Sequence, residues 1–281
     1  MGGVKRGPTR PVMRWHGGKW MLAPWIIQHF PEHRVYVEAF GGAASVLMRK
    51  PRSYAEVYND LNGDAVNVFR VLREPETAAE LERLLRLTPF AREEFEAPVN
   101  GAGPVERARR MIFRSFAGFG SAAANHEYPT GFRANSNRSG TTPAHDWAHY
   151  PNEVGAFVER LRGVVIEQRQ AIEVMRQHDS PKTLHYVDPP YPHSVRRPRK
   201  RAIKEYGEWE MTDEQHTELA LVLGGLVGHV VLSGYRCDLY DRLYCGWTRV
   251  DRRAYADGAS RRVESLWLKP GSTLSPRMVL R

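Results

Sequence analysis

The sequence predicts an α/β fold built on a mixed, mostly parallel sheet. A predicted strand at 35–40 runs directly into a glycine-rich turn, a helix follows at 46–49, and a second strand comes at 56–59. This order of strand, turn, helix and strand is typical of units with parallel strands. The full set of predicted strands lies at 35–40, 56–59, 164–167, 182–187, 229–233, 247–252 and 262–268.

Helical patterns separate these strands. Residues 73–115 are rich in Glu, Arg, Leu and Ala, with leucines at helical spacing, and 153–162 shows the same periodicity. The residues at 212–215 predict a capping box that opens a further helix. Between the helical regions, 116–151 is rich in Gly, Asn and Ser. A loop-rich insert of that length is usually functional.

Composition restricts the class of protein. An apolar content of 42% with 26% charged residues is that of a globular chain, and 41 Lys and Arg against 32 Asp and Glu give a net charge of +9. Such a basic chain suits a polyanion such as nucleic acid, although a basic soluble enzyme has the same charge. The apolar run at 219–232 is too short to span a bilayer, and residues 1–6 do not resemble a secretory leader. Cys237 and Cys245 offer no disulfide framework, so we expect a cytoplasmic protein.

The motif with the clearest chemistry is Asp188, Pro189, Pro190 and Tyr191, directly after a predicted strand. Proline has no N–H, so the turn presents acceptors without competing donors. The Asp188 carboxylate and the Pro189 carbonyl can accept both hydrogens of an exocyclic amino group, and Tyr191 offers a stacking face. Acceptors aimed at a nitrogen that becomes positive provide electrostatic catalysis. The alternative is a turn that merely ends the strand.

A glycine turn and an acidic residue form a second predicted site. Gly41 and Gly42 follow a strand and allow close approach of a ligand to the backbone. Asp60 follows Phe40 by 20 residues, the spacing at which an acid on a second strand meets ribose hydroxyls. A phosphate-binding P-loop pattern and a zinc-type histidine pattern are both missing from the sequence, and the chemistry needs no metal.

Together these motifs resemble the Dam-like, D12 class of adenine-N6-specific DNA methyltransferases. The resemblance extends to Trp15 through Lys19, the loop at 40–45, the segments at 59–62 and 233–235, and the block at 262–267. It implies a Rossmann-like core that binds S-adenosylmethionine, formed by 1–70 and 160–281, with a helical, loop-rich target-recognition domain inserted at 71–159. The residues that it implies at the cofactor are Trp15, Gly17, Gly18, Lys19, Phe40, Gly41, Gly42, Ala43, Ser45 and Asp60.

The sequence departs from the family pattern at two positions. Ala44 replaces the second loop glycine, and we expect alanine there only if its φ is negative. His16 stands where a small residue is common in the family.

The resemblance implies double-stranded DNA as the substrate of a monomer or weak dimer, with the target adenine flipped out of the helix. Arginine reads guanine and asparagine reads adenine, while clustered cations contact phosphates. The DNA-binding candidates are Arg114, Arg133, Asn135, Asn137, Arg138, Arg196, Arg197, Arg199, Lys200 and Arg201.

Several alternatives stay open at this point. Cytosine-N4 methyltransferases share the same pocket chemistry, more often with Ser in place of the Asp. Methylation of RNA or of a protein amide is a weaker alternative, and a DNA-binding regulator on an inactive fold is another. The proton of the amino group can leave to solvent or through Asp188, and the recognition sequence is not encoded in any motif.

Overall fold

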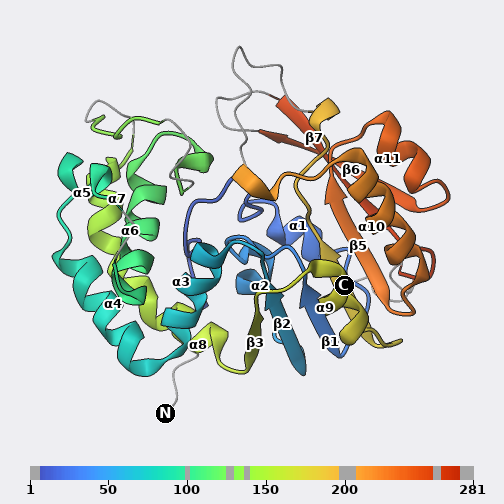
Figure 1. Ribbon diagram of the computed structural model, residues 1–281, viewed down its shortest axis with the longest axis horizontal. Coiled ribbons are helices and arrows are strands. Elements are labelled where there is room, and N and C mark those ends of the chain that lie inside the picture. Colours follow the sequence, from blue (N-terminus) through green and yellow to red (C-terminus); the bar gives the residue numbers. More distant parts are fainter. Residues whose placement is uncertain are drawn as a thin grey trace.

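The computed structural model describes residues 7–98, 102–124, 130–135, 140–195, 207–255 and 261–272. Its centre is a seven-stranded sheet in which five neighbouring strands are parallel and β7 runs antiparallel to both of its neighbours, so the fold is α/β with a mostly parallel sheet (Figure 1). In spatial order the strands are β3 (Val164–Glu167), β2 (Ala55–Asn59), β1 (Val35–Glu38), β4 (Thr183–Val187), β5 (His229–Gly234), β7 (Arg261–Leu268) and β6 (Thr248–Tyr255).

The strand order reverses between β1 and β4. From β1 the chain continues outward to β2 and β3, whereas from β4 it continues outward to β5. The two strands are paired in register, with Glu38 opposite Tyr186, so the residues that follow them emerge side by side. A crevice at the carboxyl ends of the strands, where the order reverses, is the usual ligand site of such sheets.

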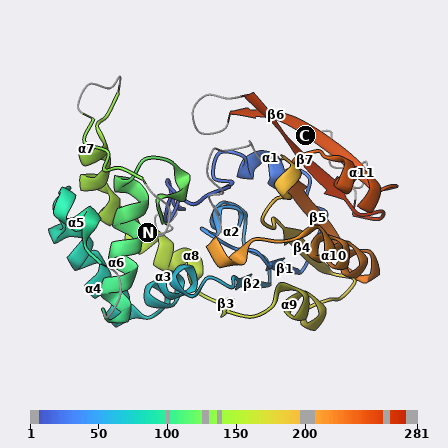
Figure 2. The same ribbon diagram turned by 45° about the horizontal axis from the view of Figure 1, so that its top comes forward.

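Helices cover both faces of the sheet and form a group at one side of it (Figures 1 and 2). Their bounds in the first half of the chain are α1 (Ala23–Ile27), α2 (Ser45–Arg49), α3 (Gly63–Arg73), α4 (Pro75–Leu87), α5 (Arg92–Glu96), α6 (Pro104–Ala117) and the 3-10 turn η1 (Ser121–Ala124). Those in the second half are α7 (Pro143–His149), η2 (Tyr150–Glu153), α8 (Val154–Leu161), α9 (Ala171–Gln177), η3 (His193–Val195), η4 (Gly207–Trp209), α10 (Asp213–Gly225) and α11 (Asp238–Leu243).

Alternation along the strands divides the core into two parts. Tyr36 and Tyr186 point toward α1 and α2, whereas Val37 and Val187 point toward α9 and α10 on the opposite face, as Figure 2 shows for the helices. The first part is continuous with the group of helices α4 to α8, where Phe113 packs edge-on against Trp147. One core therefore extends from the sheet into the helical group.

The N-terminal segment crosses from the helical group into the centre of the molecule. Thr9 donates to Glu153, the Tyr150 hydroxyl donates to the carbonyl of Val12, and the Arg14 amide donates to Ser115 Oγ at 3.1 Å. These contacts fix the lead-in to residues 15–19 against α6 and η2.

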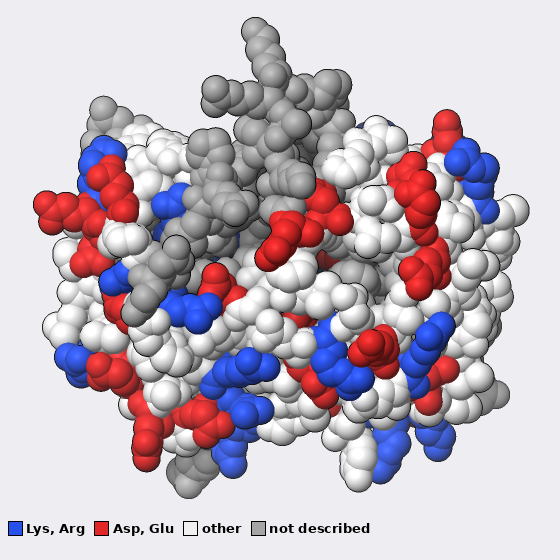
Figure 3. Space-filling view, in the orientation of Figure 1, with Lys and Arg blue, Asp and Glu red and all other residues white. Residues whose placement is uncertain are grey.

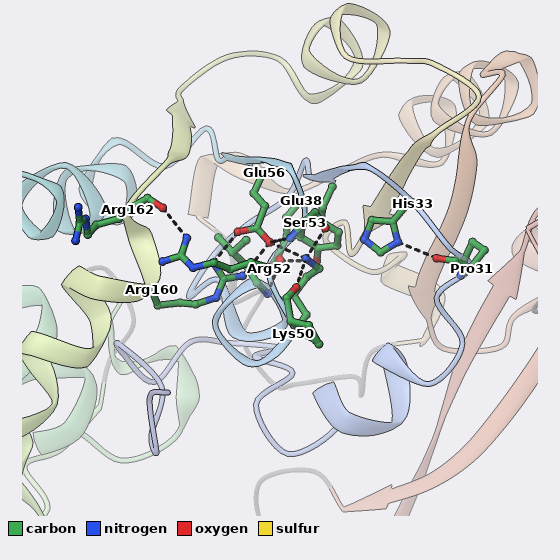
Figure 4. A network of polar contacts seen from close by, with 12 residues as sticks. Pro31, His33, Glu38, Lys50, Arg52, Ser53, Glu56, Arg160 and Arg162 are labelled. Carbon is green, nitrogen blue, oxygen red and sulfur yellow. Dashed lines mark hydrogen bonds and ion pairs between the residues drawn. The ribbon is translucent and has the colours of Figure 1, made fainter. Parts of the chain in front are cut away.

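A buried ion cluster joins α8 to β2 and to the end of α2 (Figure 4). The Glu56 carboxylate, 3% exposed, accepts two hydrogen bonds from the Arg160 guanidinium, at 2.6 and 3.0 Å, and one from Lys50 Nζ at 2.6 Å. Burial raises the pKa of Glu56, but the hydrogen bonds from Arg160 and Lys50 outweigh burial, so this pKa lies below its ordinary value.

All seven predicted strands are present, and the predicted capping box is confirmed, since Thr212 Oγ1 accepts from Gln215 N and Gln215 Oε1 accepts from Thr212 N. The segment at 116–151, predicted as a loop-rich insert, also contains α7 and two 3-10 turns. Five helices, α1, α3, α7, α9 and α11, were not predicted from the sequence. Within the described ranges, no helix has the length and apolar character that crossing a bilayer requires.

Candidate active site

A cleft of about 990 Å³ lies at the carboxyl ends of β1, β2 and β4. Its walls come from the N-terminal turn at 15–19, the loop at 39–46, the segment at 60–64, the start of α9 and the region from η4 to α10. The helical group contributes Pro98, Arg107, Met111 and Ala124. All ten residues expected at a cofactor line this cleft, together with Asp188 and Pro190.

The glycine loop is shaped by side chains packed behind it. A methyl group on Gly41 would collide with the Tyr58 ring, and one on Gly42 would meet the Trp15 indole at 2.6 Å. Gly42 also has a φ of +47°, in the left-handed region that favours glycine. The Tyr58 hydroxyl donates to the Gly42 carbonyl at 2.8 Å. The loop is therefore held between Tyr58 and Trp15, which explains why neither position tolerates a side chain.

We expect Gly42→Ala to destabilise the protein by more than the backbone conformation alone explains. Gly246 is a matched control, because its φ is +86° and an added methyl group would meet no described atom within 4 Å. Both variants lose the conformational freedom of glycine, and only Gly42→Ala adds a clash, which costs about 1–3 kcal/mol more. Guanidinium unfolding of both variants measures this difference, and equal losses would contradict the packing described here.

The expectation for Ala44 was wrong. This residue has φ +52° and ψ +35° and so adopts the left-handed conformation. A negative φ was expected, because alanine disfavours the left-handed region. It lies directly before α2, is fully buried, and its amide donates to the Gly41 carbonyl at 2.7 Å. The tight turn into α2 thus imposes the conformation, at a cost of about 1–2 kcal/mol relative to glycine.

Asp60 holds the glycine loop through the amide of Gly42, whereas Tyr58 holds it through the carbonyl of Gly42. Asp60 Oδ2 accepts from the Gly42 amide at 2.7 Å, and its Oδ1 accepts from the Asn62 amide at 2.8 Å. Burial raises the pKa of Asp60, and these backbone hydrogen bonds counteract the rise. A carboxylate has about four acceptor positions, so it can still accept from hydroxyl groups in the cleft.

Glu38 is a cleft residue that sequence reasoning missed. It is 2% exposed, and its Oε2 accepts from the Tyr36 hydroxyl at 2.6 Å and from the Leu47 amide in α2 at 2.8 Å. Burial raises its pKa to about 8, against the effect of these two hydrogen bonds. The position directly before the glycine loop, at the end of a buried strand, was the available signal.

We expect Glu38→Gln to remove a loss of stability on the alkaline side. In the folded protein the pKa of Glu38 lies near 8, above its ordinary value of 4.5. Between pH 4.5 and 8 the folded state therefore binds more protons than the unfolded state, and the free energy of unfolding falls as the pH rises through this range. The glutamine side chain would keep an acceptor for both hydrogen bonds. Unfolding free energies at pH 6.5 and 8.5 measure the effect, with the exposed Glu93→Gln as control. Identical pH dependence in wild type and Glu38→Gln would contradict the assignment.

Asp188 lies in the cleft directly after β4. Its side chain is 16% exposed, Oδ2 is 2.9 Å from Lys19 Nζ, and Oδ1 is buried with no hydrogen-bond partner among the described residues. Burial raises the pKa of Asp188 from 3.8 to about 6, the Lys19 ammonium opposes this rise, and Glu264 adds to it. The residue therefore combines an unused acceptor with ionisation near neutral pH.

The rest of the proline motif lies at different depths. Pro190 lines the cleft, whereas Pro189 is buried. Tyr191 is 7% exposed, its ring lies edge-on to Tyr235, and its hydroxyl donates to Glu264. Lys19 Nζ lies 4.9 Å from the centroid of the Tyr191 ring. Stacking of a base on Tyr191 stays a prediction.

The charge of the cleft is opposite to that of the chain. Although the chain carries +9, acidic residues outnumber basic ones among the described residues of the cleft, even without Glu38, whose raised pKa keeps it protonated at neutral pH. The acidic lining residues are Glu38, Asp60, Asp64, Asp188, Glu208, Glu210 and Glu218, and the basic ones are Lys19 and Arg107. Figure 3 shows acidic side chains near the middle of this face of the molecule. Such a lining favours a cationic ligand over a phosphorylated one.

The candidate DNA contacts are only partly described. Arg114 donates to the Phe95 carbonyl at 3.1 Å and lies over the Phe95 ring, and burial lowers its pKa. Arg133 donates to the Phe116 carbonyl at 3.2 Å, and Asn135 is exposed. The remaining candidates, Asn137, Arg138, Arg196, Arg197, Arg199, Lys200 and Arg201, lie outside the described residues. Base reading by any of them stays a prediction.

The cleft residues from Trp15 to Asp64 fall within a stretch that matches a known family. Residues 15–102 match the D12 class N6 adenine-specific DNA methyltransferases. The resemblance inferred from the motifs is thereby confirmed for this stretch, which includes every residue expected at the cofactor. The motif at 188–191 lies outside the matched range.

The chain is also similar to two curated proteins of the same class. Both are described as DNA adenine methylase and come from Vibrio cholerae serotype O1, one from a Classical and one from an El Tor strain. Each is 37% identical to this chain over 64 residues. The aligned part covers 23% of this chain and 23% of each relative.

Other cleft residues were also missed from sequence. Trp209 in η4 and Arg107 in α6 line the cleft, and Glu264 on β7 lies 3.7 Å from Lys19 Nζ. Glu264 falls in the predicted block at 262–267, so its region was noted but its role was not. Across the part of the chain that the structure describes, no group of three His, Cys, Asp or Glu could hold a metal ion.

Proposed function

We propose that this protein is a site-specific DNA methyltransferase that transfers a methyl group from S-adenosylmethionine to adenine N6 in double-stranded DNA. The observation that carries the proposal is the position of Asp188. Its carboxylate shares one cleft with the glycine loop and Asp60, and one of its oxygens has no partner in the described part of the chain. The family match over residues 15–102 supports the same reaction.

The cleft residues fit S-adenosylmethionine in charge and shape. The cofactor carries a sulfonium and an ammonium group, which suit a lining in which the described acidic residues outnumber the basic ones. We expect Asp60 to accept from the ribose hydroxyls and the loop at 41–45 to border the cofactor, beside Trp15. When bound, the cofactor supplies a methyl group on a positively charged sulfur, which is a good leaving group.

The residues of this chain act on the adenine. Asp188 Oδ1 accepts a hydrogen from the amino group, which favours the pyramidal form with a localised lone pair. The negative carboxylate then stabilises the positive charge that develops on this nitrogen. A carboxylate whose pKa is about 6 is also a suitable acceptor for the proton that the nitrogen loses afterwards.

The adenine has to leave the DNA helix to reach this carboxylate. In a duplex the amino group lies within the base stack, and enzymes that react there flip the base into a pocket. The cleft volume of about 990 Å³ is large enough for a cofactor and a base. This proposal also includes a Rossmann-like core and an inserted recognition domain at 71–159. It further includes a monomeric or weakly dimeric state and a cytoplasmic location.

The product distinguishes this function from its closest alternative. Duplex DNA is incubated with the protein and S-adenosylmethionine, digested to nucleosides and analysed by mass spectrometry. We expect N6-methyldeoxyadenosine. N4-methyldeoxycytidine would assign the cleft to cytosine, and unmodified DNA together with no calorimetric binding of S-adenosylmethionine would indicate an inactive regulator.

A further inference from the structure

A buried polar cluster lies next to Asp188 and reaches the cleft through Lys19. Its members are Lys19, Tyr191, Ser233 and Glu264, and the last of these belongs to β7. Glu264 is 3% exposed and Ser233 is fully buried. The strand order brings them together, because β7 pairs directly with β5 and β5 with β4.

Glu264 contacts three members of this cluster. Its Oε1 accepts from Ser233 Oγ at 3.0 Å and from the Tyr191 hydroxyl, and it lies 3.7 Å from Lys19 Nζ. Lys19 Nζ in turn donates to the Gly17 carbonyl at 2.6 Å. One ammonium group is thus placed between two carboxylates, those of Asp188 and of the buried Glu264.

Hydrogen bonding does not require the charge on Glu264. A glutamine of the same shape could accept from Ser233 and Tyr191 through its carbonyl oxygen. A buried carboxylate carries a large desolvation penalty, and a second carboxylate near Asp188 adds repulsion. The hydrogen bonds alone thus do not account for a carboxylate at position 264. What the ionised Glu264 adds is a negative charge close to Asp188.

We propose that Glu264 is a positioning residue for the methyl transfer assigned above: it shares the Lys19 ammonium with Asp188 and so keeps the reaction site negatively charged. With both carboxylates ionised and one lysine between them, the three groups sum to −1. Without the Glu264 charge, Lys19 neutralises Asp188 alone and the sum is zero. The site then stabilises a developing positive charge on the amino nitrogen less well. This inference rests on the proposed function.

The test must distinguish an electrostatic effect of Glu264 on Asp188 from a purely structural role of Glu264. The described titratable side chains that face Asp188 are Lys19, Tyr186, Tyr191, Glu38 and Glu264. Glu264 is among the groups that raise the pKa of Asp188, after burial and against Lys19. Its removal therefore lowers the pKa of Asp188, whereas a purely structural role would leave that pKa in place.

The experiment compares Glu264→Gln with wild type by two readouts. The first is the single-turnover rate of methyl transfer to duplex DNA between pH 5 and 8. We expect the plateau rate to fall about 10- to 100-fold, the size typical of losing a group that supports an active-site residue, with little change in KM. We also expect the acid limb of the pH profile to move to lower pH.

The second readout does not depend on activity. A carboxyl-carbon NMR titration, with the Asp188 signal assigned by its loss in Asp188→Asn, reports the ionisation of Asp188 directly. Glu264→Asp keeps the charge and is expected to leave the titration closer to wild type than Glu264→Gln does. Glu80→Gln on the exposed side of α4 controls for net charge.

The outcomes separate this inference from the proposed function. An active wild type with an unchanged rate and an unchanged Asp188 titration in Glu264→Gln would overturn the inference and leave the function intact. A wild type that transfers no methyl group would overturn the function, and the NMR titration would still decide whether Glu264 controls Asp188. Should Glu264→Gln fail to fold, Glu264→Asp tests the same coupling because it keeps the charge. A plateau rate and an Asp188 titration close to wild type are then expected, and a loss of rate of about 10- to 100-fold despite the retained charge would count against the inference.

Discussion

Replacing Asp188 by asparagine is expected to reduce the single-turnover rate of methyl transfer by about 10²–10³-fold or more. Asparagine keeps the shape of the side chain but presents one neutral acceptor, and it cannot balance the positive charge that forms on the amino nitrogen. Calorimetric binding of S-adenosylmethionine and of duplex DNA should be retained. Asp251→Asn on β6 is a matched control, because it removes an exposed carboxylate outside the cleft.

The wild-type rate should depend on pH in a defined direction. The ionised form of Asp188 is the acceptor, and its pKa is about 6, so kcat/KM should fall as the pH drops through this value. One pH unit below the pKa the rate should be about tenfold lower than on the plateau. A pH-independent rate between 5 and 8, or a turnover of Asp188→Asn equal to wild type, would contradict the role of this carboxylate.

The largest effect on stability is expected at Glu56. Glu56→Ala leaves the buried cations Lys50 and Arg160 without their shared carboxylate, and breaking a buried ion pair in this way costs about 3–5 kcal/mol. Guanidinium unfolding measures the loss. The exposed pair of Glu80 and Arg83 is the control, and Glu80→Gln should leave the unfolding midpoint nearly unchanged.

A combined substitution tests the reason for this loss. Replacing Lys50, Glu56 and Arg160 together by Met, Leu and Met removes all three charges and keeps an apolar volume. If uncompensated charge causes the loss, the triple variant should be more stable than Glu56→Ala. A triple variant that is less stable than the single one would show that the hydrogen bonds, rather than the charges, matter.

Local patterns in the sequence were sufficient to predict the residues of the site that follow the parallel strands. Parallel strands place their carboxyl ends at one edge of a sheet, so the turn at Gly41, Asp60 and Asp188 could be expected together once their strands were recognised. The helices α1, α9 and α11 have only five to seven residues, too few to show a clear period.

The part of the site that was not predicted from the sequence depends on pairing between strands that are distant in the chain. Nothing in the local sequence states that β7 inserts between β5 and β6, and this insertion brings Glu264 to Lys19 and Asp188. The expectation for Ala44 failed for a related reason. Intrinsic preference disfavours alanine at positive φ, and the packed turn before α2 overrides that preference.

The most direct test of the central claim is a structure of the protein bound to S-adenosylhomocysteine and a duplex that contains its target site. The account predicts an adenine outside the base stack, within the cleft, with N6 at hydrogen-bond distance, about 2.7–3.2 Å, from a carboxylate oxygen of Asp188. A target base that stays stacked, or that lies outside this cleft with Asp188 still bound only to Lys19, would contradict it.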